Sequence, residues 1–440
     1  MSGRRAADLD VAERRLLELV PGGTQLLSKR PEQFAPGQWP RFYDRAEGAR
    51  VWDSSGREFL DMSTSGIGTC SLGFANAEVN AAVHAAVDRG SMSSLNCIED
   101  LELAELLIEL HPWAEMVRYA RTGGEAMAVA IRLARAATGR SVVAFCGYHG
   151  WHDWYLSANL AGSGELDGHL LPGLDPLGVP RELTGTSLPF RYNNLADLEE
   201  IVAARGGELA AVVMEPVRGT NPDPGFLEGV RDLAHRAGAV LVFDEVTSAL
   251  RLNTGGIHLT YGVNPDIAVF AKALANGYPM AAIIGVQAVM EHAQRSFISS
   301  TYWTELIGPV AAIATLRQHR LHDVGARLDE VGRKVQAGWE SAAARAGLAV
   351  SVTGIPPLSH LGFADEPQAT ATLFTQELLD RGFLASRSFY PSFAHTDAQI
   401  DSYLSAVDEV FVGLADAVKT GTVVERLRGP VAQTGFTRLA

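Results

Sequence analysis

Apolar residues between positions 125 and 285 follow two alternating patterns, one helical and one extended. The segment 125–138, EAMAVAIRLARAAT, keeps apolar residues on one helical face and arginines on the other, as an amphipathic helix does. Short runs such as 239–245 (AVLVFDE) and 267–272 (IAVFAK) are apolar on both faces, which is typical of strands in a buried parallel sheet. This alternation predicts a layered α/β domain with ligand chemistry at the carboxyl ends of its strands.

The chain of 440 residues is long enough for two unequal domains. Residues 1–60 combine a helical segment, a connector rich in proline and glycine, and two short strands, and we expect an arm that belongs in part to a small domain. Residues 61–324 are expected to form the large α/β domain. From about residue 325 the pattern changes again, and 325–440 predict a smaller α+β domain.

The composition argues against some classes of binding partner and favours one cellular compartment. A formal net charge of −14 argues against nucleic acid or an anionic membrane surface as the main partner. No run of 18 apolar residues occurs in the sequence, so we expect no membrane span. The three cysteines lack CxxC spacing, and their low, odd number favours a reducing cytoplasm.

One lysine stands out. The chain has 37 Lys+Arg residues, and only four are lysines, one of which, Lys272, ends an apolar run. A lysine at a strand end commonly extends its ammonium into solvent. Asp244, however, ends the preceding predicted strand, so both side chains should reach one crevice. An amine that forms an imine and an acid that protonates a ring nitrogen are what pyridoxal phosphate (PLP) requires.

The segment 121–124, RTGG, precedes the amphipathic helix and is a candidate phosphate site. Thr122, Gly123 and Gly124 allow close backbone approach to an anion, and the N–H groups of a helix start favour negative charge. An ordinary helix start, with Thr122 as the cap and Glu125 in the first turn, explains the same residues.

The segment 146–154, CGYHGWHDW, gathers aromatic and histidine residues directly after a predicted strand. Tyr148 has a ring that could lie flat against a cofactor ring. His149 and His152 resemble a metal-binding pair, but no third ligand has suitable spacing, so we expect no metal.

Taken together, TGGEA, YHG, MEP (214–216), DEV (244–246) and AKALANGYP resemble the class III pyridoxal-phosphate aminotransferases of fold type I. The segments VPGGTQLLSKR, RAEGARVWDSSGREFLD and LGFANAEV resemble the branch of glutamate-1-semialdehyde aminomutase. The resemblance spans roughly residues 18–415. It implies a mostly parallel central sheet in the large domain, a small domain formed by both termini, and a homodimer with shared active sites.

The resemblance also assigns site residues. It implies that Lys272 forms the Schiff base with PLP and that Asp244 pairs with the pyridine nitrogen. Val246 and Tyr148 would cover the two faces of the ring. The remaining assignments are Thr122, Gly123 and Gly124 at the phosphate, and Glu215 as the family's glutamate before proline. A threonine that reaches the phosphate across the dimer is Thr301 or Thr304, and we favour Thr301.

The resemblance implies an aminotransferase that moves an amino group from an amino acid donor to a ketone or aldehyde. An intramolecular aminomutase or a racemase uses the same lysine and aspartate, as does a decarboxylase. A catalytically silent binding protein is the remaining alternative. Gly66 replaces a bulky aromatic residue of the aminomutase branch, which suggests a wider pocket for a polar acceptor. A simple chain turn explains Gly66 equally well.

Overall fold

The buried strands pair into one mixed sheet in the computed structural model, which describes residues 6–162, 164–166, 169, 173–217 and 219–435. Within these residues the sheet has seven strands in the order β4-β10-β9-β8-β7-β5-β6. Its strands are β4 (Met116–Ala120), β5 (Val142–Cys146), β6 (Ser187–Pro189), β7 (Leu209–Met214), β8 (Val240–Asp244), β9 (Ile267–Phe270) and β10 (Ala281–Gly285).

Strand direction brings most carboxyl ends to one edge. The strands β6, β5, β7, β8 and β9 pair in parallel. Only β10 runs against its two neighbours, β9 and β4. Because β4 is antiparallel to β10, it runs in the same direction as β9 and ends at the same edge. The predicted α/β fold with a mostly parallel sheet is confirmed.

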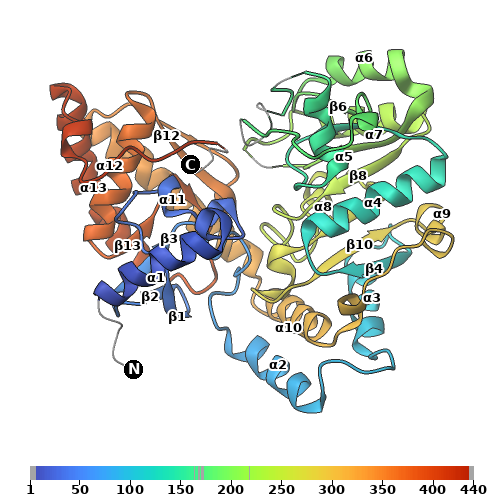
Figure 1. Ribbon diagram of the computed structural model, residues 1–440, viewed down its shortest axis with the longest axis horizontal. Coiled ribbons are helices and arrows are strands. Elements are labelled where there is room, and N and C mark those ends of the chain that lie inside the picture. The colour runs from blue at the N-terminus through green and yellow to red at the C-terminus, as the bar shows by residue number, and fades with distance from the viewer. Residues whose placement is uncertain (1–5, 163, 167–168, 170–172, 218, 436–440) are drawn as a thin grey trace. The chain divides into compact units, whose positions relative to one another are not determined.

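Alternate residues of each strand face different helices, as period-two geometry requires. Val213 and Val242 pack in one cluster with residues of α4 (Gly123–Thr138), while Val212 and Leu241 pack in another with α7 (Phe226–Arg236). The sheet is thus covered on both faces (Figure 1). The other helices of this unit are α2 (Ala77–Arg89), α3 (Glu99–Leu110), α5 (Asp153–Leu156), α6 (Leu195–Arg205), α8 (His258–Tyr261), α9 (Gln287–Met290) and α10 (Ile307–Leu321).

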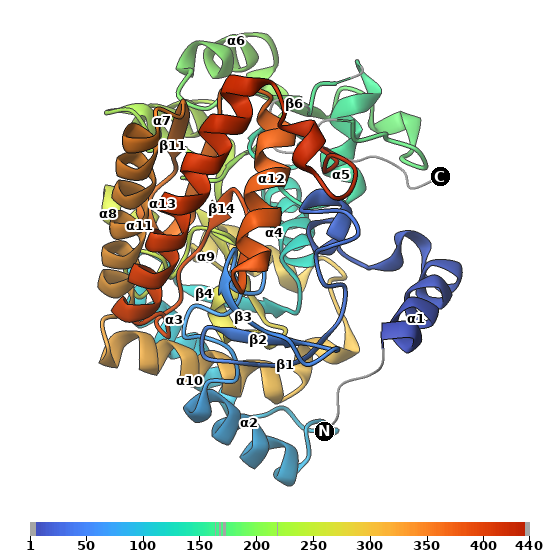
Figure 2. The ribbon, with the colours of Figure 1, turned by 90° about the vertical axis from the view of Figure 1, so that its left-hand side faces the viewer.

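The chain forms two compact units, residues 77–326 and residues 1–76 with 327–440. The second unit carries a four-stranded sheet, β1-β2-β3-β13, and a three-stranded sheet, β11-β12-β14, within the described residues. Helices α12 and α13 pack side by side in it (Figure 2). Its strands are β1 (Tyr43–Glu47), β2 (Arg50–Asp53), β3 (Glu58–Met62), β11 (Val350–Thr353), β12 (Ser359–Phe363), β13 (Phe383–Ala385) and β14 (Ser388–Phe389), and its helices are α1 (Ala6–Leu19), α12 (Pro367–Asp380) and α13 (Asp397–Thr420), with α11 (Val324–Ala346) crossing the boundary.

The first boundary follows Asn76 instead of residue 60. Residues 61–76 bond to the carboxyl-terminal part of the chain: the Ser65 hydroxyl donates to Tyr390 O at 2.8 Å, and Phe393 N donates to Ser71 O at 2.7 Å. Both partners belong to the unit that is formed by the two termini.

No helix in the described part of the chain is both long enough and apolar enough to cross a membrane.

Candidate active site

The candidate residues cluster at the carboxyl edge of the seven-stranded sheet. Asp244 is the last residue of β8 and lies opposite Val269 of β9. Lys272 follows two residues after β9, and Glu215 directly follows β7. Thr122 follows β4 and Tyr148 follows β5. The sheet therefore brings together side chains that are up to 150 positions apart in the sequence.

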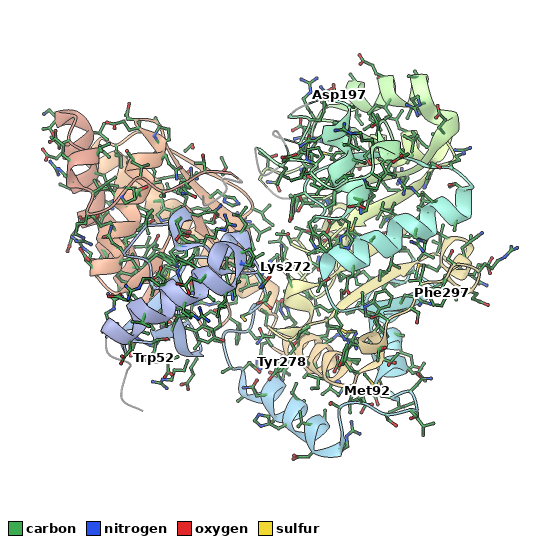
Figure 3. All side chains as sticks on the ribbon, in the orientation of Figure 1. Trp52, Met92, Asp197, Lys272, Tyr278 and Phe297 are labelled. Atoms are coloured by element: carbon green, nitrogen blue, oxygen red, sulfur yellow. The ribbon has the colours of Figure 1, made fainter. Side chains whose placement is uncertain are left out.

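Lys272 occupies a strained backbone position. Its φ is +47°, in the left-handed region that non-glycine residues rarely adopt. Such a conformation costs about 1–3 kcal/mol and is concentrated at functional sites. The half-buried side chain donates from Nζ to Thr247 Oγ1 at 2.8 Å. Figure 3 labels this lysine.

Asp244 is buried, with 3% of its surface exposed, and both carboxylate oxygens are engaged. Oδ1 accepts from Val246 N at 3.0 Å. Oδ2 lies 2.8 Å from Nδ1 of the buried His149. The carboxylate is thus fixed by the turn that follows its own strand and by the loop that follows β5.

The second nitrogen of His149 also has a partner. Nε2 lies 3.1 Å from Cys146 O, a carbonyl that accepts a hydrogen bond. Both ring nitrogens are thus engaged, which fixes the orientation of the imidazole toward Asp244 Oδ2.

The candidate phosphate turn is a capped helix start. Thr122 Oγ1 accepts from Glu125 N at 3.4 Å, and Glu125 Oε2 accepts from Thr122 N at 3.0 Å, which forms a capping box. The N–H groups of Gly123 and Gly124 are the first two of α4, and no carbonyl within a helix can accept from them. The capping box therefore leaves these two N–H groups available to an acceptor outside the helix.

Gly123 contacts the residue after the Asp-Glu pair. A Cβ placed on Gly123 would lie 2.9 Å from Val246 Cγ1, a separation that real side chains do not tolerate. Only glycine lets the phosphate turn approach the Val246 side chain this closely. The turn and Val246 are therefore parts of one packed surface.

Tyr148 is held through its backbone. Its N–H donates to Glu215 Oε2 at 3.0 Å, and its ring meets Tyr155 edge-on at 5.9 Å. The preceding Gly147 has φ +113°, and a Cβ there would lie 2.8 Å from Glu215 Oε2. Glu215 contacts the Tyr148 loop, so the contact visible in the structure is one that positions Tyr148.

His149 and His152 point to different partners. His149 contacts Asp244, whereas the His152 ring stacks on Trp151 with centroids 4.3 Å apart. No group of three or more His, Cys, Asp or Glu side chains suited to a metal ion occurs among the residues that the structure describes.

Thr301 and Thr304 are the ends of one short 3₁₀ turn, and both are exposed. The Thr304 hydroxyl donates to Thr301 O at 2.9 Å. Which of the two threonines serves as the phosphate ligand stays a prediction.

A buried hydrogen-bond network holds the turn that follows Asp244. Glu245 Oε1 accepts from His258 N at 2.9 Å and from His258 Nδ1 at 2.8 Å, and His258 Nε2 accepts from Trp113 Nε1 at 3.0 Å. His111 donates from Nδ1 to Leu107 O and accepts from Gly256 N at Nε2. Burial lowers the pKa of His111 to about 4.

Gly66 lies in a left-handed turn of the other unit. Ser65, Gly66, Ile67 and Gly68 all have positive φ, between 45° and 77°. A Cβ on Gly66 would also lie 3.1 Å from Thr69 Oγ1. A side chain at this position would crowd Thr69, Cys70 and Phe74, which favours the chain-turn interpretation over the wider pocket.

Sequence reasoning missed the contacts of two residues. Thr247 binds Lys272, and His149, whose side chain the sequence suggests only as a metal ligand, contacts Asp244. The motif YHG places His149 shortly after β5, which neighbours β7 in the sheet. This position was the one signal in the sequence for a contact with the carboxyl edge of the sheet. A single histidine in a loop does not reveal which strand end it will meet.

Comparison with known proteins gives a consistent result. Residues 34–411 match the family model described as aminotransferase class-III. The chain is 33% identical over 409 residues to the 3-aminobutyryl-CoA aminotransferase of Cloacimonas acidaminovorans, an alignment that covers 89% of this chain and 94% of that protein. It is 34% identical over 420 residues to the glutamate-1-semialdehyde 2,1-aminomutase of Desulfosudis oleivorans, covering 90% and 96%.

The solved structures show the same likeness. The PLP internal aldimine form of the FumI protein of Sphingopyxis sp. MTA144 superposes with a TM-score of 0.85 at 25% sequence identity. The match covers 93% of this chain and 97% of that chain.

Proposed function

The chain belongs to the class-III aminotransferases and is a PLP-dependent enzyme, and from that premise we propose that Lys272 and Asp244 perform transamination between an amino acid donor and a polar ketone or aldehyde. The observation that carries this proposal is their placement. Lys272 follows β9 and Asp244 ends β8, on neighbouring parallel strands.

The residues present fit the cofactor. An amine at Lys272 suits its aldehyde carbon, the buried carboxylate of Asp244 suits its ring nitrogen, and the first N–H groups of α4 suit its phosphate. When bound, PLP accepts the electrons of the carbon that bears the amino group.

Lys272 is proposed to move a proton. Its Nζ, once free, can take the proton from the substrate carbon that bears the amino group and donate it at the aldehyde carbon of the cofactor, on the other side of the amino nitrogen. Arginine could not do this, since its pKa lies above about 12. Thr247 Oγ1 lies 2.8 Å from Nζ and would hold the free amine in place between the two transfers.

Asp244 is proposed to keep the ring nitrogen protonated, and His149 to position Asp244. The carboxylate sits in a buried site, where a charged pair interacts more strongly than in water. Val246 and Tyr148 are proposed to cover the two ring faces, and Gly123 and Gly124 to face the phosphate with Thr122. Glu215 is proposed to act through Tyr148.

We also propose a homodimer in which Thr301 reaches the phosphate of the partner. Exposed apolar side chains support this interface: Met92, Leu95, Ile98, Leu101 and Tyr302. The Thr304 hydroxyl lies 3.9 Å from Met92 Sδ, so the threonine turn borders this patch. Figure 3 labels Met92. Because three cysteines are free, a reducing compartment, the cytoplasm, is the proposed location.

An intramolecular aminomutase is the second candidate, because the relative from Desulfosudis oleivorans carries that name. Mass balance distinguishes a transaminase from an aminomutase. A transaminase moves ¹⁵N from a labelled donor to a separate carbonyl compound and consumes both. A mutase converts one amine to its isomer without a second substrate. Isomerisation without net transfer to any acceptor of a broad panel would refute the transaminase proposal.

A further inference from the structure

Arg121 and Glu305 form an ion pair between the two turns that carry the proposed phosphate ligands. Arg121 directly precedes the phosphate turn, which begins at Thr122, and Glu305 directly follows the short 3₁₀ turn Thr301–Thr304. Arg121 Nε donates to Glu305 Oε1 at 2.8 Å. The two side chains are only 9% and 16% exposed, so water and salt screen this pair less than a surface pair.

The pair is also bonded to the backbone on both sides. Arg121 Nη2 donates to the main-chain O of Glu305 at 2.9 Å, so the guanidinium group holds this residue through its backbone as well as its carboxylate. On the other side, Arg121 N donates at 3.3 Å to Glu125 Oε2, the oxygen that also accepts from Thr122 N in the capping box. The ion pair therefore connects the backbone of one turn to the backbone of the other.

Close packing holds the carboxylate of Glu305 in place. Its Oε2 accepts from Ile307 N at 2.7 Å and its Oε1 from Gly308 N at 2.9 Å, which satisfies the first two N–H groups of α10. A Cβ placed on Gly308 would lie 2.9 Å from Glu305 Oε1 and 2.9 Å from Met280 Sδ. Met280 Sδ lies 3.3 Å from Arg121 Nη1. Both charged groups thus sit at fixed positions in a site without spare room.

The two turns face different active sites in the proposed dimer. The phosphate turn belongs to the protomer's own site, whereas Thr301 reaches the phosphate of the partner. Only three residues separate Thr301 from Glu305, and the Thr304 hydroxyl donates to Thr301 O within the turn. The position of Glu305 therefore limits the position of Thr301, and one ion pair connects the groups that meet two different phosphates.

We propose that Arg121 and Glu305 are positioning residues for both cofactor phosphates of the dimer. Through Arg121 the pair orients the phosphate turn of its own site, and through Glu305 it orients the threonine turn that reaches the partner's site. This inference rests on the proposed homodimer and on the proposed phosphate ligands. A substitution of the pair in one protomer should then weaken PLP binding at both sites. A pair that only supported the fold of its own protomer would leave the partner's site unchanged.

Mixed dimers measure the two effects one at a time. One protomer carries Lys272→Ala, the other keeps Lys272, and two different affinity tags isolate the mixed species. Borohydride then attaches PLP at Lys272, so intact-mass analysis over a PLP titration reports the affinity of the site that holds this lysine. Labelling of the Lys272→Ala protomer gives the background.

Glu305→Gln in the Lys272→Ala protomer should weaken PLP at the other protomer's site about 10-fold, because the threonine turn is the part that reaches that site. Arg121→Gln in the protomer that keeps Lys272 should weaken the same site by a similar factor through the phosphate turn. Arg121→Lys, which keeps the charge, should recover part of this loss. Arg320→Gln is the matched control in either protomer, since Arg320 of α10 forms an exposed pair with Glu109 at 3.0 Å, and it should leave the affinity unchanged.

Unchanged affinity with Glu305→Gln in the Lys272→Ala protomer would overturn the inference, and Thr301→Val in that protomer shows why. If Thr301→Val weakens PLP, the threonine contact stands and the ion pair does not position it. If Thr301→Val has no effect either, or if the wild type is a monomer in sedimentation velocity, the proposed contact across the dimer has itself failed. A loss of PLP that occurs only where a mixed dimer dissociates would also overturn the inference.

Discussion

His149 Nδ1 lies 2.8 Å from Asp244 Oδ2, and this contact joins the loop after β5 to the end of β8. Strand β7 separates these two strands in the sheet. The aspartate proposed to meet the cofactor is thus oriented by a histidine from a strand that is not its neighbour. The Nε2 bond to Cys146 O fixes the ring in turn.

Replacing His149 should therefore weaken catalysis without removing the cofactor. His149→Leu leaves Asp244 Oδ2 without its partner, and a hydrogen bond to a charged group contributes about 1.5–3 kcal/mol, so we expect kcat to fall about 10- to 100-fold. His149→Gln, which retains a donor, should recover part of this loss. The pH dependence of the PLP spectrum should also move in His149→Leu. An unchanged pH profile would show that His149 only supports the fold.

Gly123→Ala should reduce the affinity for PLP. The added methyl group would lie 2.9 Å from Val246 Cγ1, so the phosphate turn or Val246 must shift. Val246→Ala removes the obstacle, and the double variant should bind PLP better than Gly123→Ala alone. Gly207→Ala is the control, because a Cβ there has no neighbour within 4 Å. Equal PLP affinity in Gly123→Ala and wild type would contradict the proposed position of the phosphate.

Leu95→Glu should shift the protein from dimer to monomer. Leu95 is 79% exposed within one chain, and a buried charge in an apolar interface is costly. If Thr301 reaches the partner's phosphate, the monomer should also bind PLP more weakly. Val412→Glu alters a comparably exposed apolar residue on α13 and should leave the dimer intact. Sedimentation velocity distinguishes these outcomes, and a dimeric Leu95→Glu protein would exclude this patch.

Acid should destabilise the fold partly through His111. The pKa of its imidazole falls from 6.5 to about 4 on burial, so the folded state binds fewer protons than the unfolded state between these values. The contribution of neutral His111 to the free energy of unfolding is fully present well above pH 6.5. It is lost progressively as the pH falls toward 4. From pH 7 to pH 5 this loss is about 2 kcal/mol.

His111→Asn should show a smaller fall in melting temperature between pH 7 and pH 5 than the wild type. The exposed His322→Gln variant should keep the wild-type fall. An unchanged fall in His111→Asn would mean that other groups carry the acid sensitivity.

The sequence was sufficient for the family, the α/β sheet and the cofactor, and the comparisons confirm these. Apolar runs on both faces revealed the parallel strands, and the residue after each run revealed the edge at which Asp244 and Lys272 meet. The roles of the individual site residues stay predictions.

Patterns in the sequence do not predict backbone conformations or contacts that depend on the tertiary structure. The left-handed φ of Lys272 follows from the turn after β9, since lysine has no local preference for it. The close neighbours of Gly66 within its turn explain its small size, whereas the sequence left a chain turn and a wider pocket equally open.

The absorbance spectrum of the purified enzyme, titrated with an amino acid donor, tests the central claim most directly when Lys272→Ala and Lys334→Ala are measured beside the wild type. We predict a visible PLP band in the wild type and Lys334→Ala that a donor converts to a band at shorter wavelength. Lys272→Ala should not complete this conversion at a comparable rate. A wild-type rate in Lys272→Ala, or no band in the wild type after PLP is added, would contradict the assignment of Lys272.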